Sequence, residues 1–389
     1  MSFHFPIDRE WPPRALSSLS QLLHPCEFPA AVIRSQRDHH PLHFSLHATS
    51  PFAMTVSPAP PIAAAAAELR AGNLVAIPTE TVYGLGANAW NEEAVAKIFE
   101  VKGRPATNPL IVHLPDVTRV GQCVELPLSA EISAAFDKLV PFWPGPLTVV
   151  LPKSNKVSDL VTAGRDTVAV RIPQHPVARE LLQACEFPIA APSANRSTAV
   201  SPTTAQHVTD ELGDTIAMIL DGGPSTVGLE STIINLTESP PRILRHGGIT
   251  AETLAEALKV DVTTLTRGAD QETQHAKVGY SSPGQMTVHY SPRTPVQLVS
   301  DWTAQDDERI GWIRFSNDPQ AHPTQKVAPV TRTLSDQGDL TEIARLLFAT
   351  LRELDELDLD RIVIDTCEEQ GIGRAIMDRI RRATARRTS

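Results

Sequence analysis

Two cationic side chains and an imidazole lie within one short stretch of the chain, residues 77–114. Lys102 and Arg104 flank a glycine in the sequence Lys-Gly-Arg-Pro, and His113 follows within an apolar run. Arginine binds an anion as a planar fork and lysine binds it as a point charge, so both could converge on one phosphate group. Two ordinary explanations compete: basic residues stabilise the dipole at a helix C-terminus, and a histidine on an apolar strand is often a core residue.

Later apolar segments also lead into polar side chains. Ser193 and Asn195 follow the strand expected at 187–191, and ligands bind at the carboxyl ends of strands in α/β sheets. Arg171 is expected on the inner side of a strand, where its partner is either a ligand carboxylate or a structural Asp or Glu. A Gly-Leu-Glu-Ser-Thr turn leads to Ser231, and Arg245 lies just beyond the last strand expected in this domain. Taken alone, the Ser193 and Asn195 pattern is also typical of an ordinary turn.

Other catalytic patterns are absent from the sequence. No lysine follows a glycine, so there is no P-loop of the form Gly-x-x-x-x-Gly-Lys-Ser/Thr. Gly84–Ala89 matches Gly-x-Gly-x-x-Ala, but Pro78–Tyr83 separates it from the preceding strand, whereas a dinucleotide-binding turn begins where the strand ends. We therefore expect these glycines to permit a tight turn. Nothing resembles a Ser/His/Asp triad or a metal cluster of His and carboxylates.

The elements that must position these residues are expected to be strands and helices that follow one another without strict alternation. The sequence predicts an α/β domain with a mixed, twisted sheet over residues 59–259. In this domain Asn91 caps a helix that ends at Gly103 and carries Lys102. The other elements expected are helices at 62–70, 129–139, 177–184 and 203–212, and strands at 74–77, 110–114, 147–151, 167–172, 187–191, 216–220, 231–236 and 242–244.

A second, smaller α/β domain is expected at 293–387, after a polar linker at 260–292. Its expected elements are strands at 296–299, 310–315 and 361–364 and helices at 340–354 and 374–384. Residues 1–58 are rich in Pro, Ser and His and show no sustained period. This composition indicates a disordered leader, or an extension upstream of a start at Met54.

Composition excludes several classes of protein. The chain of 389 residues has a formal net charge of −10, which is not that of a protein that coats nucleic acid. Its four cysteines form no Cys-x-x-Cys pair, which argues against a zinc ribbon or a disulfide framework and fits a reducing cytoplasm. No apolar run reaches the length that a membrane helix needs.

Several segments together resemble the YrdC-type threonylcarbamoyl-AMP synthases, in order and in spacing. The matching segments are Pro78–Gly86, Lys102–Leu110, Trp143–Thr148, Val168–Pro173, Ala191–Ser197 and Gly228–Ile233. The tetrad of Lys102, Arg104, Ser193 and Asn195 matches the hallmark of that family. Residues 282–292 and 371–383 are similar to the carboxyl-terminal part of its longer form. The resemblance implies a YrdC-like twisted mixed sheet followed by a smaller Rossmann-like α/β domain.

The resemblance also implies a reaction. L-Threonine and bicarbonate, or carbon dioxide, would give an N-carboxylated threonine whose carboxylate attacks the α-phosphate of ATP and releases pyrophosphate. A separate tRNA threonylcarbamoyl transferase complex would then use the threonylcarbamoyl-adenylate to make threonylcarbamoyladenosine in tRNA. Mg²⁺ would enter with ATP and have no direct protein ligand.

Site residues follow from the same resemblance, position by position. The tetrad would be catalytic. The ATP contacts would be Arg104, Asn108, Thr167, Ser193, Ser201 and Arg245. The threonine contacts would be Thr81, His113, Arg171, Ala191 and Ser231, with Arg171 on the amino-acid carboxylate. The linker from Ser282 to Tyr290 would form a lid over the nucleotide.

Three other functions stay open from the sequence. An RNA-binding module would use Lys102 and Arg104 as backbone contacts, although few aromatic residues accompany them. Salt-dependent tRNA affinity without threonine-dependent ATP turnover would favour that module, and weak RNA binding is compatible with a synthase as well. A carbamoyltransferase that matures hydrogenases has a similar domain, but it also carries zinc-finger-like segments that this sequence lacks. A paralogue that makes no adenylate is disfavoured by the complete tetrad.

Overall fold

The computed structural model describes residues 61–267, 290–303, 308–318 and 330–385. All of these residues belong to one compact unit, Ser57–Ser389. The whole leader expected at 1–58 falls outside the described residues, as does Ser282 of the expected lid. Among the helices that are described, none combines the length and the apolar character needed to cross a membrane.

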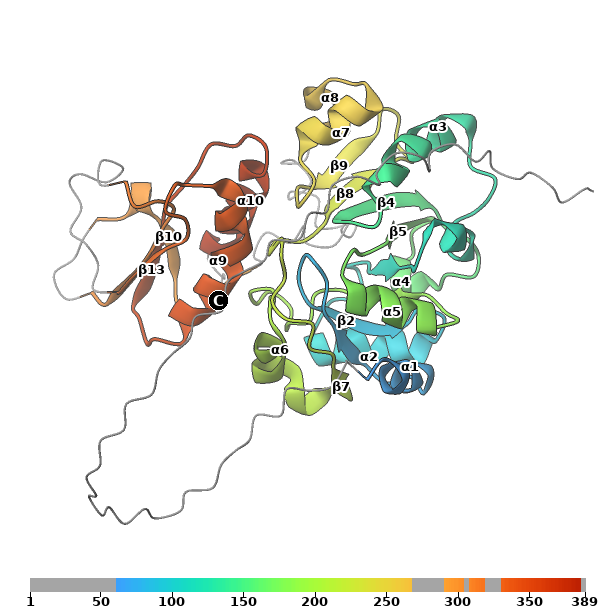
Figure 1. Ribbon diagram of the computed structural model, residues 1–389, viewed down its shortest axis with the longest axis horizontal. Helices are drawn as coiled ribbons and strands as arrows, with labels where there is room; N and C mark the ends of the chain where they lie inside the picture. The colour runs from blue at the N-terminus through green and yellow to red at the C-terminus, as the bar shows by residue number, and fades with distance from the viewer. Residues whose placement is uncertain (1–60, 268–289, 304–307, 319–329, 386–389) are drawn as a thin grey trace, which may run out of the picture. The chain divides into compact units, whose positions relative to one another are not determined.

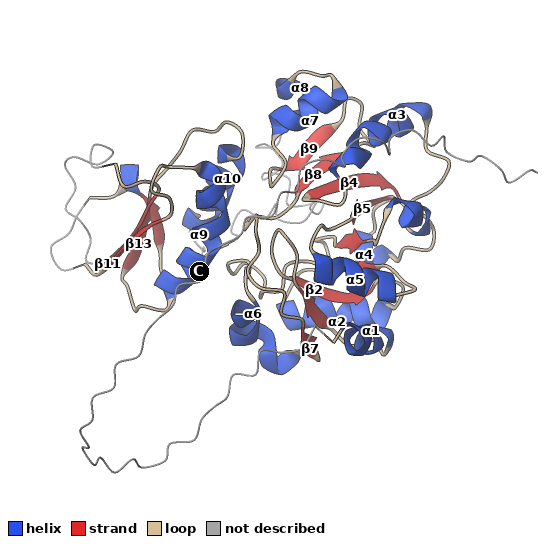
Figure 2. Cartoon of the chain, viewed as in Figure 1, coloured by secondary structure: helices blue, strands red, loops and turns tan. Residues whose placement is uncertain are grey.

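A nine-stranded mixed sheet forms the first part of the described chain (Figures 1 and 2). The strand order is β7-β1-β2-β6-β3-β5-β4-β8-β9. The strands are β1 Val75–Ile77, β2 Gly84–Asn88, β3 Ile111–His113, β4 Leu147–Pro152, β5 Thr167–Arg171, β6 Ile189–Ala190, β7 Met218–Ile219, β8 Thr232–Asn235 and β9 Arg242–Arg245. Strand β3 is parallel to β5 and β4 is parallel to β8, whereas β4 and β5 are antiparallel. The predicted mixed sheet is thus confirmed.

The glycine segment at 84–89 corrects one expectation. It forms the strand β2, which pairs antiparallel with both β1 and β6, so the predicted tight turn was wrong. A Cβ atom at Gly86 would lie 2.7 Å from Cδ1 of Ile77 and 3.0 Å from Cγ2 of Ile189. Packing inside the sheet, rather than the geometry of a turn, therefore requires this glycine.

The predicted helices are all present, with three further helices between and after them. The α-helices of this part are α1 Ile62–Arg70, α2 Glu92–Lys102, α3 Ala130–Leu139, α4 Asp159–Thr162, α5 Pro176–Ala184, α6 Ala205–Leu212, α7 Ala251–Leu258 and α8 Val262–Thr266, and the 3-10 turns are η1 Val117–Gln122, η2 Val140–Phe142 and η3 Gly213–Thr215. Helices α4, α7 and α8 were not predicted. Leu254 of α7 and Leu265 of α8 pack in the main core. Helix α8 was missed because the segment after residue 260 is polar and rich in threonine, and its single buried leucine gives no helical pattern.

The two faces of the central strands have different surroundings. On β5, Val168 and Val170 pack in the main core with residues of α2, α3 and α7. Ala169 points the other way, into a small apolar cluster with Ile111, Val150, Ile233 and Leu244. Alternate residues of a strand face opposite sides of a sheet, so Arg171 shares the face of Ala169. One face thus holds the core, and the other presents Arg171 over an apolar floor.

The second part of the described chain contains a four-stranded parallel sheet of order β10-β13-β11-β12. Its elements are β10 Val296–Leu298, η5 Val299–Asp301, β11 Ile310–Arg314, β12 Val330–Thr333, α9 Leu340–Asp355, β13 Arg361–Ile364 and α10 Gly373–Thr384. Strand β12 was not predicted. Both helices pack with the sheet in one core, which also includes Val82, Val200 and Leu229 of the first part. This smaller parallel sheet confirms the two-part α/β architecture.

Helix α2 ends at the Lys-Gly-Arg motif, and both of its termini match the prediction. Oδ1 of Asn91 accepts a hydrogen bond from Ala94 N at 3.1 Å, and Glu92 and Glu93 occupy the first turn. Gly103 ends the helix with a φ of +60°, a conformation that favours glycine. The cap and the glycine together fix where Arg104 leaves the helix.

We predict that Asn91→Ala lowers the free energy of unfolding by about 1 kcal/mol, because it leaves a backbone N–H of the first turn without its acceptor. Asn91→Asp keeps an acceptor oxygen and is the matched control. The midpoints of urea unfolding, followed by circular dichroism, measure the difference. Equal midpoints for Asn91→Ala and the wild type would show that the cap does not stabilise α2.

Candidate functional site

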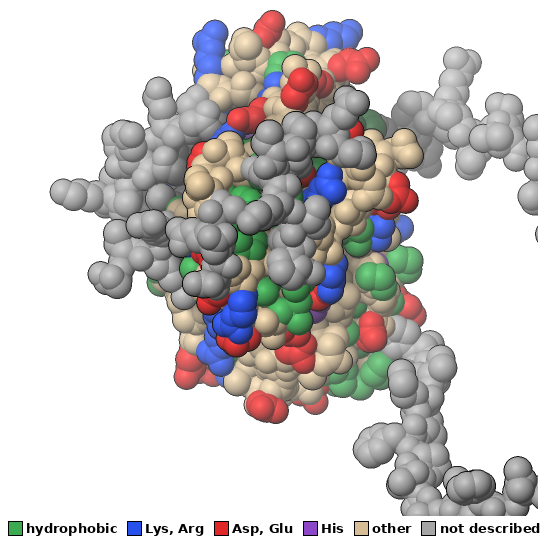
Figure 3. Space-filling model, turned by 90° about the vertical axis from the view of Figure 1, so that its left-hand side faces the viewer, with side chains coloured by type: hydrophobic (Ala, Val, Ile, Leu, Met, Phe, Trp, Pro, Cys, Tyr) green, Lys and Arg blue, Asp and Glu red, His purple; other side chains and the backbone are tan. Residues whose placement is uncertain are grey.

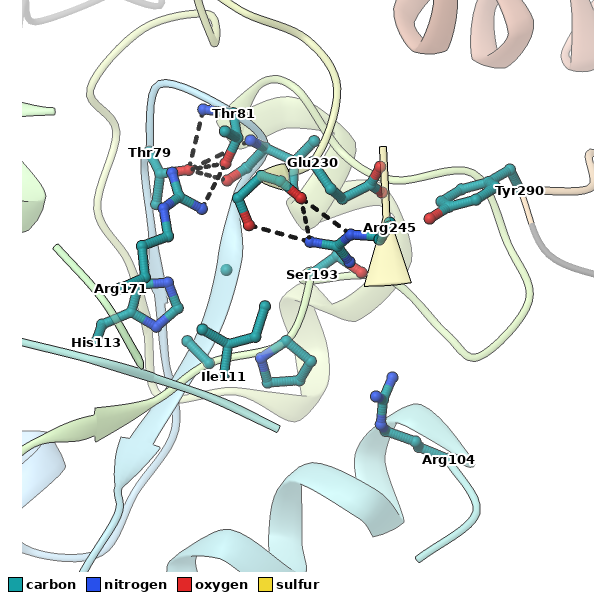
Figure 4. A pocket seen from close by; sticks show the side chains of 15 residues that line it. Thr79, Thr81, Arg104, Ile111, His113, Arg171, Ser193, Glu230, Arg245 and Tyr290 are labelled. Carbon is teal, nitrogen blue, oxygen red and sulfur yellow. Dashed lines mark hydrogen bonds between the residues drawn. The ribbon is translucent and has the colours of Figure 1, made fainter. Parts of the chain in front are cut away.

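A largely buried cavity lies beside the open face of the first sheet (Figure 4). The empty space within it, open solvent included, is about 510 Å³. Its lining comes from segments far apart in the sequence. The lining residues are Thr79, Thr81, Val82, Gly84, Arg104, Ile111, His113, Arg171, Ala191, Pro192, Ser193, Glu230, Ser231, Arg245 and Tyr290.

Register between neighbouring strands brings several of these side chains together. His113 on β3 is opposite Arg171 on β5, and Arg171 is opposite Thr148 on β4. The Thr148 hydroxyl lies 2.7 Å from the hydroxyl of Ser231, just before β8. Arg245 on β9 then donates to the Ser231 hydroxyl at 3.1 Å. A row of polar groups therefore runs across the sheet from β3, through β5, β4 and the start of β8, to β9.

Three guanidinium groups line the cavity, and all are buried. Arg104, Arg171 and Arg245 are at most 8% exposed. They come from the residue after α2's glycine cap, from β5 and from β9, and Figure 4 shows them around the cavity. Burying several cations is costly unless each meets an acceptor, so their partners decide what else the cavity can bind.

Arg171 has a structural partner, which was one of the two alternatives left open by the sequence. Its Nη2 lies 2.7 Å from Oε1 of Glu80, and both side chains are 5% exposed. Its Nη1 donates to the Thr81 hydroxyl at 2.9 Å. The other Glu80 oxygen accepts from Gln174 N at 3.0 Å. Glu80 thus fixes one edge of the guanidinium while Arg171 still lines the cavity.

Arg104 has neutral partners. Its Nη2 donates to Oδ1 of Asn108 at 2.7 Å and to the carbonyl of Pro109 at 2.8 Å. Among the described residues no carboxylate forms an ion pair with it. Burial, and then the charge of Arg245, lower the pKa of Arg104 to about 9, so it is still a cation at neutral pH. A buried cation without a counter-ion is a strong candidate to bind an anionic ligand.

Lys102 and Asn195 lie next to the cavity but not in its lining. Nζ of Lys102 donates to the carbonyl of Ser193 at 2.6 Å and to the carbonyl of Asn195. Burial, followed by Arg104, holds the pKa of Lys102 well below its usual value. The Asn195 amide donates to the carbonyl of Ala199 at 2.9 Å. The structure thus brings the predicted tetrad together. Arg104 and Ser193 face the cavity, whereas Lys102 and Asn195 form hydrogen bonds that hold the loop at 193–199.

The predicted threonine contacts all gather in one lining. These residues are Thr81, His113, Arg171, Ala191 and Ser231. His113 is buried, and its Nδ1 has no hydrogen-bond partner in the described part of the chain. Burial, and then the charge of Arg171, lower the pKa of His113 to about 3, so the imidazole is neutral near pH 7. A neutral imidazole can accept one hydrogen bond and donate another.

The predicted ATP contacts are more dispersed. Besides Arg104, Ser193 and Arg245 in the lining, Asn108 lies behind Arg104, and Ser201 donates to Oε1 of Glu230 at 2.6 Å. Thr167 lines a second, smaller cavity with Pro109, Leu110, Val150, Thr162, Arg165 and Ala169. Thr167 and Arg171 share one face of β5, so they leave the strand about 13 Å apart at roughly 3.3 Å per residue. The two cavities therefore lie along one strand.

Two carboxylates near the site were not predicted as site residues. Glu230 lines the cavity, and Glu80 pairs with Arg171 behind it. The sequence placed both only within turns. A usable signal was present, since each acid precedes a hydroxyl residue in a segment next to an apolar strand, where a buried carboxylate must find a cation. Tyr290, the described end of the expected lid, also lines the cavity, and its ring stacks on Phe348 of α9 with centroids 5.3 Å apart.

Known proteins resemble the chain along most of its length. Residues 67–247 match a family model described as telomere recombination, and residues 249–385 match the model of the threonylcarbamoyl-AMP synthase C-terminal domain. The threonylcarbamoyl-AMP synthases of Pyrococcus abyssi and Bacillus subtilis are 41% and 38% identical to it, over 83% and 84% of this chain and 94% of each relative. The crystal structure of P. abyssi Sua5 complexed with L-threonine aligns with a TM-score of 0.73 at 39% identity, covering 83% of this chain and 94% of that one.

The depressed pKa of His113 predicts a pH dependence of stability. The pKa of about 3 in the fold lies below the ordinary value of 6.5, so between these values the unfolded chain binds a proton that the folded chain excludes. The free energy of unfolding must therefore fall as the pH is lowered through this range. We expect His113→Asn to weaken this dependence by about one proton, measured from urea midpoints between pH 6.5 and 4.5. Parallel pH profiles for the variant and the wild type would refute the buried neutral state.

Proposed function

The chain belongs to the threonylcarbamoyl-AMP synthase family, and we propose that the cavity lined by Arg104, Arg171 and Arg245 is its active site. Membership makes the protein an enzyme of the nucleotidyltransferase type that acts in the threonylcarbamoyladenosine modification of tRNA. In the proposed reaction, L-threonine, bicarbonate and ATP give threonylcarbamoyl-AMP and pyrophosphate. The observation that carries the placement is the buried guanidinium of Arg104, which forms no ion pair within the described residues.

The ATP end of the site would be organised around Arg104. The carboxylate of N-carboxythreonine attacks the α-phosphorus, and the bond from that phosphorus to the pyrophosphate oxygen breaks. Negative charge then builds on the α-phosphate and on the leaving group, and fixed cations stabilise it without a protein nucleophile. Arg104, Arg245 and the Ser193 hydroxyl line the cavity and can supply this stabilisation. Lys102 would act mainly by positioning the loop that carries Ser193, because its Nζ donates hydrogen bonds to the carbonyls of Ser193 and Asn195.

The threonine end would lie toward Arg171 and His113. The P. abyssi relative was crystallised with L-threonine, which supports threonine as the amino acid here. Arg171 keeps one edge against Glu80 and could bind the substrate carboxylate with the rest of its guanidinium. His113 and Thr81 would then contact the amine or the hydroxyl. At the far end of β5, Thr167 would face the nucleoside from the second cavity.

Mg²⁺ would enter with ATP, bound through phosphate oxygens and water. Among the described residues no group of three or more His, Cys, Asp or Glu side chains could hold a metal ion. Mg²⁺ commonly uses substrate phosphates and keeps several waters, so it needs no protein cage. We further propose that the product passes to a tRNA threonylcarbamoyl transferase complex in the cytoplasm. The four cysteines without a Cys-x-x-Cys pair are compatible with that reducing compartment.

A dominant RNA-binding role is less well supported than catalysis. Figure 3 shows basic and acidic side chains interspersed on the face that it presents, where grey atoms do not cover it. The net charge is −10, whereas proteins that bind RNA through phosphates need a basic surface. Weak RNA contact during product transfer remains compatible with the proposal.

Turnover can be tested directly. The protein is incubated with ATP, Mg²⁺ and bicarbonate, with and without L-threonine, and pyrophosphate and threonylcarbamoyl-AMP are quantified. We expect both products only when threonine is present, because the attacking carboxylate forms on its amino group. Pyrophosphate release that is independent of threonine would overturn the proposed function.

Arg104→Ala tests the placement of the phosphates. We expect kcat/KM to fall about ten- to a thousandfold, the scale for removing one preorganised electrostatic donor. Arg70→Ala is the matched control, because Arg70 is a 51% exposed arginine that pairs with Glu186 on the surface. That control should retain the wild-type rate. Unchanged kinetics in a folded Arg104→Ala protein would remove Arg104 from the site.

A further inference from the structure

Glu230 places a carboxylate in the wall of a cavity that is proposed to hold a triphosphate. The residue is 5% exposed and lines the cavity beside Ser231 and Arg245. A carboxylate at this place would repel an anionic ligand unless its charge were balanced. The Ser201 hydroxyl donates to its Oε1, but a neutral hydroxyl does not cancel the charge. The balancing charge must come from a cation.

One such cation is Arg379, which belongs to the smaller α/β part of the chain. Arg379 lies on α10, its side chain is 0% exposed, and its Nε donates to Oε2 of Glu230 at 3.0 Å. Its Nη1 lies 2.7 Å from Oδ2 of Asp378, and its guanidinium carbon sits 5.2 Å from the centre of the Tyr290 ring. Arg379 therefore reaches the cavity wall through Glu230 and Tyr290 without lining the cavity itself.

Groups from several elements act on the Glu230 carboxylate. Arg379 comes from α10, Arg245 from β9, and Ser201 and Tyr290 from the segments between elements. Burial alone would raise the pKa of Glu230, but Arg379 and then Arg245 hold the pKa below its usual value, so the group is ionised. Burial lowers the pKa of Arg245 to about 10, and Glu230 acts against this lowering. Glu230 thus links the charge of Arg379 to the charge of Arg245.

We propose that Arg379 is a positioning residue for adenylate synthesis: by pairing with Glu230 it neutralises the cavity wall and leaves Arg245 to bind the anionic substrate. The inference rests on the proposed function of this cavity. It gives the smaller α/β part of the chain a defined task, which is to supply the charge that completes the nucleotide site. Without Arg379, the carboxylate of Glu230 would oppose ATP and compete with it for Arg245.

A second arginine on the same helix provides a comparison. Arg374 on α10 pairs with Glu252 on α7, so it also joins the two parts of the chain. Neither Arg374 nor Glu252 lines the cavity. If Arg379 served only to dock α10, loss of either arginine would have the same kinetic result. If Arg379 sets the charge of the cavity wall, only its loss should alter the binding of ATP.

The experiment measures KM for ATP and kcat from pH 6 to 8 for the wild type, Arg379→Met, Arg379→Met/Glu230→Gln and Arg374→Met. In Arg379→Met, Glu230 loses its main counter-charge, so burial raises the pKa of its carboxyl and the ionised fraction grows with pH. We expect the ratio of its KM to the wild-type KM to rise with pH, reaching about tenfold at pH 8. The double variant removes the carboxylate as well, and it should return to within about threefold of the wild type at every pH.

Arg374→Met should keep the wild-type KM for ATP across the range, even if its melting temperature is lower. Thermal melts establish that each variant is folded. A pH-independent KM ratio for Arg379→Met, or a double variant no better than the single one, would overturn the role of Arg379. If the wild type itself shows no threonine-dependent pyrophosphate release, it is the proposed function that fails, and this is seen before any variant is compared.

Discussion

Burial of positive charge is the constraint on which the site depends. Arg104, Arg171 and Arg245 are all removed from water around one cavity, with Lys102 directly behind it. Their acceptors differ: carbonyl and side-chain amide oxygens for Arg104, carbonyls for Lys102, the Glu80 carboxylate for Arg171, and oxygens of Ser231 for Arg245. Within the described residues no carboxylate balances the charge of Arg104, and a polyanionic substrate would do so. The fold itself therefore holds these charges in place, which is what electrostatic catalysis requires.

The sheet can carry these buried charges because its two faces have different surroundings. One face of β5 is buried in a large apolar core with helices α2, α3 and α7, and that core stabilises the domain. The other face carries only a small apolar cluster, over which the polar row from His113 to Arg245 can gather. A shift of one residue in the register of β5 would move Arg171 into the core and Val170 into the cavity. The hydrophobic pattern of the strands therefore also fixes the site.

The two parts of the chain are joined by more than a linker. Val82, Val200 and Leu229 of the first part pack in the same core as α9 and α10. Gly228 makes this approach close, since a Cβ atom there would lie 2.4 Å from the backbone oxygen of Arg345 on α9. Gly228 is two residues before Glu230 in the sequence, so the contact with α9 and the ion pair with Arg379 hold the same turn. The smaller sheet thereby acts on the cavity through a segment that lines it.

The sequence by itself determined most of the elements and the family. Caps at Asn91 and Gly103 and the alternation along β5 are local patterns, and motifs such as Lys-Gly-Arg-Pro retain their meaning without coordinates. The local pattern led to a wrong prediction at Gly86. A glycine is needed there because Ile77 and Ile189 on neighbouring strands leave no room for a Cβ atom. Only the tertiary structure decided that Glu80 is the partner of Arg171, that Lys102 faces backbone carbonyls, and that Arg379 reaches Glu230. The physical reason is that the partner of a buried charge is chosen by proximity in space, and these partners lie as many as 149 residues apart in the chain.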